Sequence, residues 1–320
     1  MAYAYDRQLA PWVTKLPPID YRDPRDAREA AWARQYQRQP RAVPDSLWVR
    51  EYVLPSATEA PGARIRVYGP ALLTSEHSAL PAVLYFHGGG FVTGDLETGH
   101  DECMWIAASL GVVVINVNYR LAPYHPYPVA VMDAHAAFHW ALTHADAVGI
   151  DRRRIAVAGH GSGAGIAAAL CLLTRERISH RPCFQLLGNP LLDDRLETTS
   201  ARLYVDTPVR DRTQLAYSWF HYVGGGAGGP EVPVLAAPAR AADLRGLPPT
   251  HVSVCEFDPA RDEAITYAQR LTRAGVSTEL HHYPGTFADC AALLDADVTQ
   301  RMRQDGLFAL GRALLTPGSG

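Results

Sequence analysis

Residues 157–165 read VAGHGSGAG, and this stretch decides the fold. The apolar residues before it predict a strand, and the alanine-rich segment from Ser162 onward predicts a helix. A tight strand-to-helix turn flanked by glycines, in the pattern G-x-S-x-G, is typical of a nucleophile elbow. With Gly159 and Gly163 as the flanking glycines, Gly161 occupies the nucleophile position. The pattern therefore predicts an elbow whose central residue has no side chain.

Short apolar strands alternate with helical segments on both sides of this stretch, which indicates an α/β sheet that is mainly parallel and covered on both faces. The predicted strands are Trp48–Leu54, Arg64–Tyr68, Ala82–Phe86, Val112–Asn116, Ile155–Ala158, Phe184–Leu187, His251–Val254 and Thr278–His282. The predicted helices are Asp26–Arg38, Glu102–Leu110, Pro128–His144, Ser162–Arg177, Asp262–Ala274 and Ala288–Leu315. Eight strands are therefore expected.

The predicted core spans residues 46–315. Residues 1–45 are rich in arginine and proline and are expected to form an N-terminal arm of a cap. Residues 194–229 interrupt the strand and helix alternation and are expected to be an insertion that joins this arm in a helical cap. Residues 316–320 are expected to be a flexible tail.

A second glycine-rich stretch, HGGGF at residues 87–91, directly follows a predicted strand. Because glycines carry no Cβ atom, the chain there can turn its backbone N–H groups toward a developing negative charge. His87, Gly88, Gly89 and Gly90 are therefore predicted to form an oxyanion-binding loop. After a strand of an α/β pattern, this signal is much more specific than a glycine-rich turn alone.

Composition excludes several classes of function. The formal charge of −3 and the 48% hydrophobic residues are ordinary for a globular protein and lack the basic excess of nucleic-acid binders. Lys15 is the single lysine among 30 lysine and arginine residues, and it lies outside any motif for Schiff-base or P-loop chemistry. No apolar run is long enough to span a bilayer. We expect no nucleic acid and no membrane among the partners.

Cysteines and histidines give no cofactor signal. The five cysteines are isolated and odd in number, without a C-x-x-C pair, which fits a reducing, cytoplasmic location. The histidines are scattered, and Gly88–Gly90 lacks the spacing of a dinucleotide fingerprint. No metal and no organic cofactor are therefore expected. The oligomeric state is not readable from the sequence, and a homodimer stays open.

The chain resembles the hormone-sensitive-lipase-like branch of the α/β-hydrolase family, the bacterial esterases, from about residue 5 to residue 315. The resemblance rests on HGGGF and on four further segments: NYRLAP at 118–123, LLDDR at 191–195, LPPT at 247–250 and EFDPARDE at 256–263. It implies an α/β-hydrolase fold with a helical cap. It also implies an oxyanion hole at the HGGG loop.

The same resemblance shows where this chain departs from the family. The family motif ending in G-D-S-A-G-G aligns with residues 159–164, so Gly161 stands in place of the triad serine and His160 in place of aspartate. The family pattern Y-P-G-x-x-H places Ala288 where the triad histidine belongs. Tyr124 replaces a usual glutamate, and Asp258 keeps the triad aspartate. Ester hydrolysis by the usual route needs all three triad groups.

Other residues near these positions are candidates for the remaining chemistry. Asp258, without its histidine, is a general base, an orienting group or a relic. His160 is a candidate general acid or base, and Ser162 a candidate substitute nucleophile, although both residue types are also common as structural residues at such turns. Around a predicted pocket for a hydrophobic small molecule, the further candidates are Asp289, Cys290, Trp219 and Phe220.

Three functions remain open. The first, which the sequence favours, is a non-hydrolytic enzyme, such as a cyclase, lyase, isomerase or pericyclase in specialised metabolism, because the covalent machinery is lost while the carbonyl-polarising loop remains. The second is a receptor-like protein that binds a ligand and returns it unchanged. The third is a carboxylesterase or lipase-like hydrolase that was inactivated by design or keeps residual activity.

Overall fold

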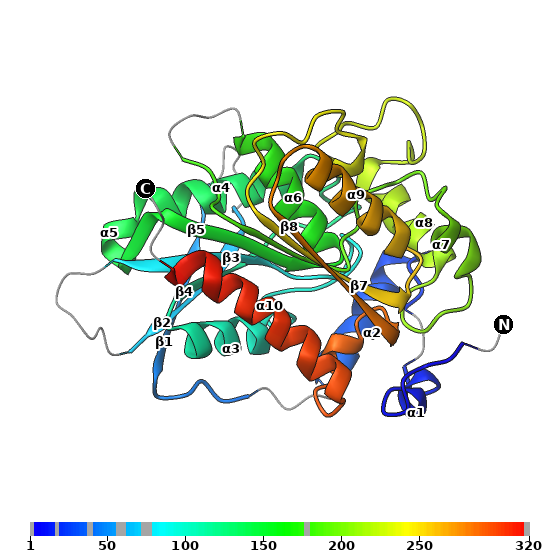
Figure 1. Cartoon of the computed structure of the whole chain (residues 1–320), viewed down its shortest axis with the longest axis horizontal. Coiled ribbons are helices and arrows are strands. Elements are labelled where there is room, and N and C mark those ends of the chain that lie inside the picture. Colours follow the sequence, from blue (N-terminus) through cyan, green and yellow to red (C-terminus); the bar gives the residue numbers. More distant parts are fainter. Residues whose placement is uncertain are drawn as a thin grey trace.

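One eight-stranded sheet organises the computed structural model (Figure 1), which describes residues 3–16, 19–36, 41–55, 62–71, 79–175 and 180–316. The strands lie in the order β1-β2-β4-β3-β5-β6-β7-β8, with β2 antiparallel to both β1 and β4 and every other pair parallel. The strands are β1 Leu47–Val53, β2 Arg64–Pro70, β3 Leu80–Phe86, β4 Val113–Asn118, β5 Ile150–His160, β6 Gln185–Gly188, β7 Thr250–Phe257 and β8 Thr278–Phe287. The predicted α/β-hydrolase fold with a mainly parallel eight-stranded sheet is confirmed.

Helices cover both faces of the sheet (Figure 1). On one face, α3 and α10 pack on the side chains of Val83 and Tyr85; on the other, α4 and α6 pack on Leu84 and Phe86. Burial on both faces explains why the central strands are apolar throughout rather than alternating. The core helices are α3 His100–Leu110, α4 Val129–Thr143, α5 Ala145–Val148, α6 Ser162–Thr174, α9 Arg261–Arg273 and α10 Asp297–Leu315.

Four further helices gather at one end of the sheet, where both the N-terminal arm and the segment between β6 and β7 lie (Figure 1). These are α1 Ala10–Val13, α2 Pro24–Tyr36, α7 Thr199–Leu203 and α8 Arg212–Val223. Arg28 of α2 donates hydrogen bonds to the carbonyl oxygens of Val92 (2.9 Å) and Ala122 (2.8 Å). The backbone N–H of Tyr21 donates to Gln214 of α8 at 2.7 Å. The arm is thus tied to the core and to the inserted segment.

The structure corrects one helix boundary. The predicted helix over Ala288–Leu315 is wrong in its first nine residues, because β8 continues to Phe287 and Asp289 adopts a left-handed backbone with φ of 59°. A short 3-10 turn follows at Cys290–Ala292, and α10 begins at Asp297. A residue with positive φ cannot continue a right-handed helix. The end of the predicted tail, residues 317–320, lies outside the described residues.

None of the helices in the described part of the chain is both long enough and apolar enough to cross a membrane. The longest of them, α10, has 19 residues. It carries charged side chains along its length, including Asp305 and Arg312.

Gly163 of α6 offers a test of this packing. A Cβ atom at Gly163 would overlap the carbonyl oxygens of Phe86 and His87, whereas one at Gly306 of α10 would lie 3.5 Å from Leu186, an ordinary contact. We therefore expect Gly163→Ala to lower the free energy of unfolding by about 1–3 kcal/mol. Gly306→Ala should leave it unchanged or raise it by up to about 1 kcal/mol. Urea denaturation measures both, and equal effects would contradict the packing.

Candidate active site

The elbow predicted at residues 159–163 is formed. Gly161 lies between the end of β5 and the start of α6 with φ of 53° and ψ of −117°, a backbone conformation that residues with side chains rarely adopt. Its N–H donates to the carbonyl of Gly188 at 2.8 Å, and its carbonyl accepts from the N–H of Leu191 at 3.0 Å. The turn is therefore fixed on both sides although no side chain projects from its centre.

The HGGGF loop lies directly beside this elbow. A Cβ atom at Gly88 would lie 3.3 Å from the carbonyl oxygen of His160, so loop and elbow are in contact. Gly89 and Gly90 have φ of 119° and 59°, conformations for which glycine is required or strongly favoured. Phe91 shares the left-handed conformation, with φ of 64°. The loop thus has the location and backbone freedom expected of a carbonyl-binding loop.

His87 is a structural part of this loop. Its ring is fully buried, stacks on the ring of Tyr119 with centroids 4.3 Å apart, and places Nδ1 2.7 Å from the carbonyl oxygen of Gly88. Burial lowers the pKa of His87 to about 4. The imidazole is therefore neutral at pH 7, and His87 positions the loop without bringing charge to it.

Arg210 fills the space in front of the elbow. The residue lies in the inserted segment between α7 and α8, is 9% exposed, and its Nη2 donates a short, charge-assisted hydrogen bond to Oδ2 of Asp258. A Cβ atom at Gly161 would lie 3.2 Å from Nη1 of Arg210. The guanidinium therefore lies between Asp258 and the Gly161 elbow.

The environment keeps Arg210 charged. Burial lowers the pKa of Arg210, but Asp258 and Asp289 raise it more, so the pKa lies above its ordinary value. Nε of Arg210 is buried and has no hydrogen-bond partner among the described residues. Asp258 is 1% exposed and accepts a second hydrogen bond from the N–H of Ala260 at 2.9 Å. A positive charge is thus held in place at the centre of the site.

Sequence reasoning missed Arg210. It is one of many arginines, lies in no motif, and is 48 positions before its partner in the sequence. One signal could have found it: a buried aspartate without its histidine needs another cationic or hydrogen-bonding partner, and the cap insertion is the adjacent segment. That reasoning would have pointed to residues 194–229 without choosing the residue.

The structure places the C-terminal candidates around this pair. Ala288 is fully buried just after β8 and supplies no acid or base. Asp289 is exposed, and its charge contributes to raising the pKa of Arg210. Cys290 is buried with its Sγ 3.9 Å from Sγ of Cys255, and Cys255, like Asp258, belongs to the β7 region. Of these candidates, Asp289 is therefore coupled to the site by charge.

Ser162 and His160 lie on either side of the elbow, in different surroundings. Ser162 is fully buried in the first turn of α6, with Oγ 3.4 Å from Oη of Tyr119. The ring of His160 lies against Gly188 and lines a hollow between the sheet and α10. Neither side chain makes a hydrogen bond to Arg210 or Asp258 in the described structure. Their catalytic roles stay predictions.

The predicted aromatic residues separate into core and surface. Trp219 is fully buried, 5.1 Å from the ring of Phe91, which in turn stacks on Tyr222 at 3.8 Å. Phe220 is 54% exposed. Trp219 therefore supports the HGGGF loop by packing against Phe91, and Phe220 lies on the exposed side of α8.

Two cap residues that the sequence analysis did not select lie over Gly90. A Cβ atom there would lie 2.6 Å from Oγ of Ser218 and 3.2 Å from Cζ of Tyr21. Burial raises the pKa of Tyr21, so its phenol stays protonated and can donate a hydrogen bond. The arm and α8 thus enclose the loop from the cap side.

This geometry agrees with comparisons to known proteins. A family model described as alpha/beta hydrolase fold matches residues 83–291. The chain belongs to this family. Over 234 residues it is 39% identical to Esterase LipI of Mycobacterium tuberculosis, covering 72% of each chain, and over 255 residues it is 37% identical to Carboxylesterase NlhH of the same species, covering 78% of each.

Solved esterase structures share nearly the whole fold of this α/β hydrolase. A structure described as Bacterial Heroin Esterase is 40% identical with a TM-score of 0.91, covering 97% of this chain and 98% of that one. Esterase LipW from Mycobacterium marinum is 34% identical with a TM-score of 0.86, covering 98% and 97%. The homologues of this chain thus include esterases across its full length.

The ion pair of Arg210 and Asp258 gives a stability prediction. Arg210→Met should lower the free energy of unfolding by about 3–5 kcal/mol, because Asp258 would be left as an uncompensated buried charge. Arg210→Met combined with Asp258→Leu should recover a large part of that loss. Arg245→Met, which breaks the exposed pair with Asp243, is the control and should have no measurable effect. A double variant as unstable as the sum of the two single changes would contradict the coupling.

His87 gives a pH prediction. Because its pKa is about 4 when folded and near 6.5 when unfolded, the unfolded chain takes up a proton first as the pH falls. The free energy of unfolding should therefore fall between pH 6.5 and 4, by up to roughly 3 kcal/mol from this group. His87→Gln should flatten that decline in urea denaturation, and the exposed His139→Gln should not. Parallel curves for all three proteins would contradict the assignment.

Proposed function

We propose that this α/β hydrolase binds carboxylic esters at the Gly161 elbow and hydrolyses them slowly, without a covalent acyl-enzyme. The observation that carries the proposal is a formed elbow and HGGGF loop around a glycine, with a charged Arg210 in front of it. The esterase names of the relatives support ester as the substrate class. They favour the hydrolase alternative over a non-hydrolytic reaction.

The two groups that covalent catalysis needs, a hydroxyl nucleophile and a general base, are absent from the positions where the family pattern has them. An acyl-enzyme needs a hydroxyl at position 161 and a base at position 288, where this chain has glycine and alanine. Loss of triad groups typically costs about 10⁴ to 10⁶ in rate and leaves only the contributions of binding and the oxyanion hole. We therefore infer that the departures of Gly161 and Ala288 from the family pattern are functional losses rather than shifts in alignment.

The remaining groups suit a carbonyl or carboxylate. Under the proposal, backbone N–H groups of the HGGGF loop would meet the partial negative charge on a carbonyl oxygen. Arg210 adds a fixed guanidinium that would attract the carboxylate of an acid product. In hydrolysis assisted by this site, the oxygen of a water molecule bonds to the carbonyl carbon and the bond to the alcohol oxygen breaks. The alcohol leaves with a proton from that water, so acid and alcohol are formed.

Arg210 also competes for the group that a restored triad would need. A histidine at position 288 would have to hydrogen-bond Asp258, whose Oδ2 already accepts from Arg210. Restoring serine and histidine alone should therefore give a weak enzyme. Removing Arg210 as well should free Asp258 to orient the new base.

The test is hydrolysis of short-chain nitrophenyl esters. We expect the wild type to be slower than the triple variant Gly161→Ser, Ala288→His, Arg210→Ala by about 10³-fold or more in kcat/KM. The double variant without the Arg210 change should lie between them. Ser162→Ala in the wild type is the matched control and should change nothing. A wild type that matches the triple variant would overturn the proposal.

Product analysis separates the other two functions. A non-hydrolytic enzyme would convert a carbonyl ligand into an isomer or elimination product, and a receptor-like protein would return it unchanged. Under the proposal, prolonged incubation with an ester yields acid and alcohol, measurably faster than in buffer. An ester that binds and is recovered intact at the buffer rate would contradict hydrolysis and favour the receptor-like function.

A further inference from the structure

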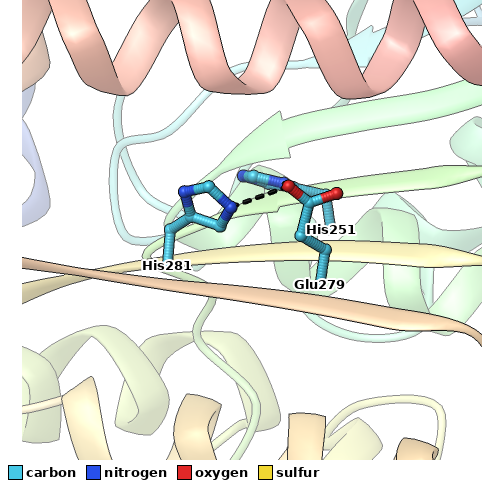
Figure 2. Close-up of side chains that lie close together, drawn as sticks. All are labelled: His251, Glu279 and His281. Atoms are coloured by element: carbon cyan, nitrogen blue, oxygen red, sulfur yellow. Dashed lines mark hydrogen bonds and ion pairs between the residues drawn. The ribbon is translucent and has the colours of Figure 1, made fainter.

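We propose that His251, Glu279 and His281 form a binding site for a divalent transition metal ion such as Zn²⁺. Figure 2 shows the three side chains close together, projecting from the neighbouring strands β7 and β8 toward the side of the sheet on which α10 lies. Two imidazoles and one carboxylate are a donor set that zinc commonly takes. The site is independent of the Gly161 elbow and of the proposed function.

Strand register brings these residues together. His251 of β7 is paired with Glu279 of β8, and Ser253 with His281. Residues two apart on a strand project from the same face, so Glu279 and His281 share the face on which His251 lies. Their possible ligand atoms all lie within 4.8 Å of one another. A parallel pair of strands therefore presents a three-ligand cluster.

The surroundings of His251 give the strongest indication that this cluster binds a metal ion. Its side chain is 1% exposed, and neither Nδ1 nor Nε2 has a hydrogen-bond partner among the described residues. A metal ion binds an imidazole through the lone pair of one ring nitrogen, and neither nitrogen of His251 is engaged by a described residue. A bound ion would satisfy a buried nitrogen.

The distances require only small movements. Nδ1 of His251 is 4.0 Å and Nε2 of His281 is 2.7 Å from Oε1 of Glu279. Tetrahedral zinc with bonds of about 2.0–2.1 Å holds its ligand atoms about 3.3 Å apart. One of these pairs must therefore approach and the other separate by about 0.6–0.7 Å, and the ring nitrogens of the two histidines, which lie within 4.8 Å of each other, must approach by up to about 1.5 Å. Rotations of the three side chains can supply such movements.

Surrounding groups orient the ligands as in many metal sites. Nδ1 of His281 is 3.3 Å from Oδ2 of Asp305 on α10, which leaves Nε2 for the metal. Oδ2 of Asp305 also accepts from the hydroxyl of Tyr283 at 2.8 Å. Nη2 of Arg312 donates to the second oxygen of Glu279 at 2.6 Å. A bound ion would thus connect the edge strand β8 with α10.

An ion also has a route to the site. His251 lines the hollow between the sheet and α10 that His160 also lines. Glu279 and His281 are partly exposed, so the cluster is open to solvent on their side. Three protein ligands leave a fourth position for water.

Metal binding to tag-free protein, stripped with a chelator, tests the proposal. We expect one Co²⁺ per chain with the visible absorption of a tetrahedral site, and one Zn²⁺ in competition with it. His251→Ala and His281→Ala should weaken binding by at least about 100-fold, and Asp305→Asn by about 10- to 100-fold. The exposed His282→Ala, on the same strand, is the matched control and should bind as the wild type does.

The melting temperature is a second measurement, which also applies to variants that fold poorly. Zn²⁺ should raise the melting temperature of the wild type and of His282→Ala, because it binds only the folded state, and should not raise that of His251→Gln or His281→Gln. Failure of the wild type to bind Co²⁺ or Zn²⁺, or equal binding by every variant, would overturn the proposal. Neither result bears on ester hydrolysis, so the two proposals fail separately.

Discussion

The buried ion pair between Arg210 and Asp258 is the interaction on which the rest of the site depends. Asp258 is held inside the protein at the end of β7, where a carboxylate without a partner would be strongly destabilising. Arg210, from the segment between α7 and α8, supplies that partner and joins this segment to the end of β7. Because its Nη1 faces the elbow, a side chain at Gly161 would compete with it for space. A side chain at position 161 would therefore require the Arg210 guanidinium to shift by a few tenths of an ångström, whereas glycine requires no shift.

The elbow and the HGGGF loop keep backbone conformations with positive φ although Gly161 at the centre of the elbow carries no side chain. Gly161, Gly89 and Gly90 all have positive φ, and Phe91 has it despite its side chain. Packing maintains them: Trp219 and Tyr222 support Phe91, and Tyr21 encloses Gly90 from the cap. Positive φ costs glycine little, so the strained residue is Phe91, and strained residues cluster at sites that hold a fixed geometry. This geometry around a fixed positive charge is why we propose that the site binds an ester carbonyl or carboxylate.

The parts of the structure that depend on local pattern could be predicted from the sequence. Runs of apolar residues located all eight strands, and the glycine spacing located the elbow and the loop next to it. The helix predicted from Ala288 failed because composition does not reveal that Asp289 takes a left-handed backbone. Arg210 and Tyr21 were missed because their importance comes from contacts with residues far away in the chain. The cluster of His251, Glu279 and His281 was missed for the same reason: the histidines look scattered until strand register places them side by side.

The most direct measurement of the central claim is intact-protein mass spectrometry after treatment with a fluorophosphonate, which labels activated serine nucleophiles covalently. Without a hydroxyl at position 161 and a base at position 288, the wild type should remain unlabelled, and the variant Gly161→Ser, Ala288→His, Arg210→Ala should gain one label. Labelling of the wild type at Ser162 would contradict a site that works without a covalent intermediate. It would identify Ser162, in the first turn of α6, as the nucleophile.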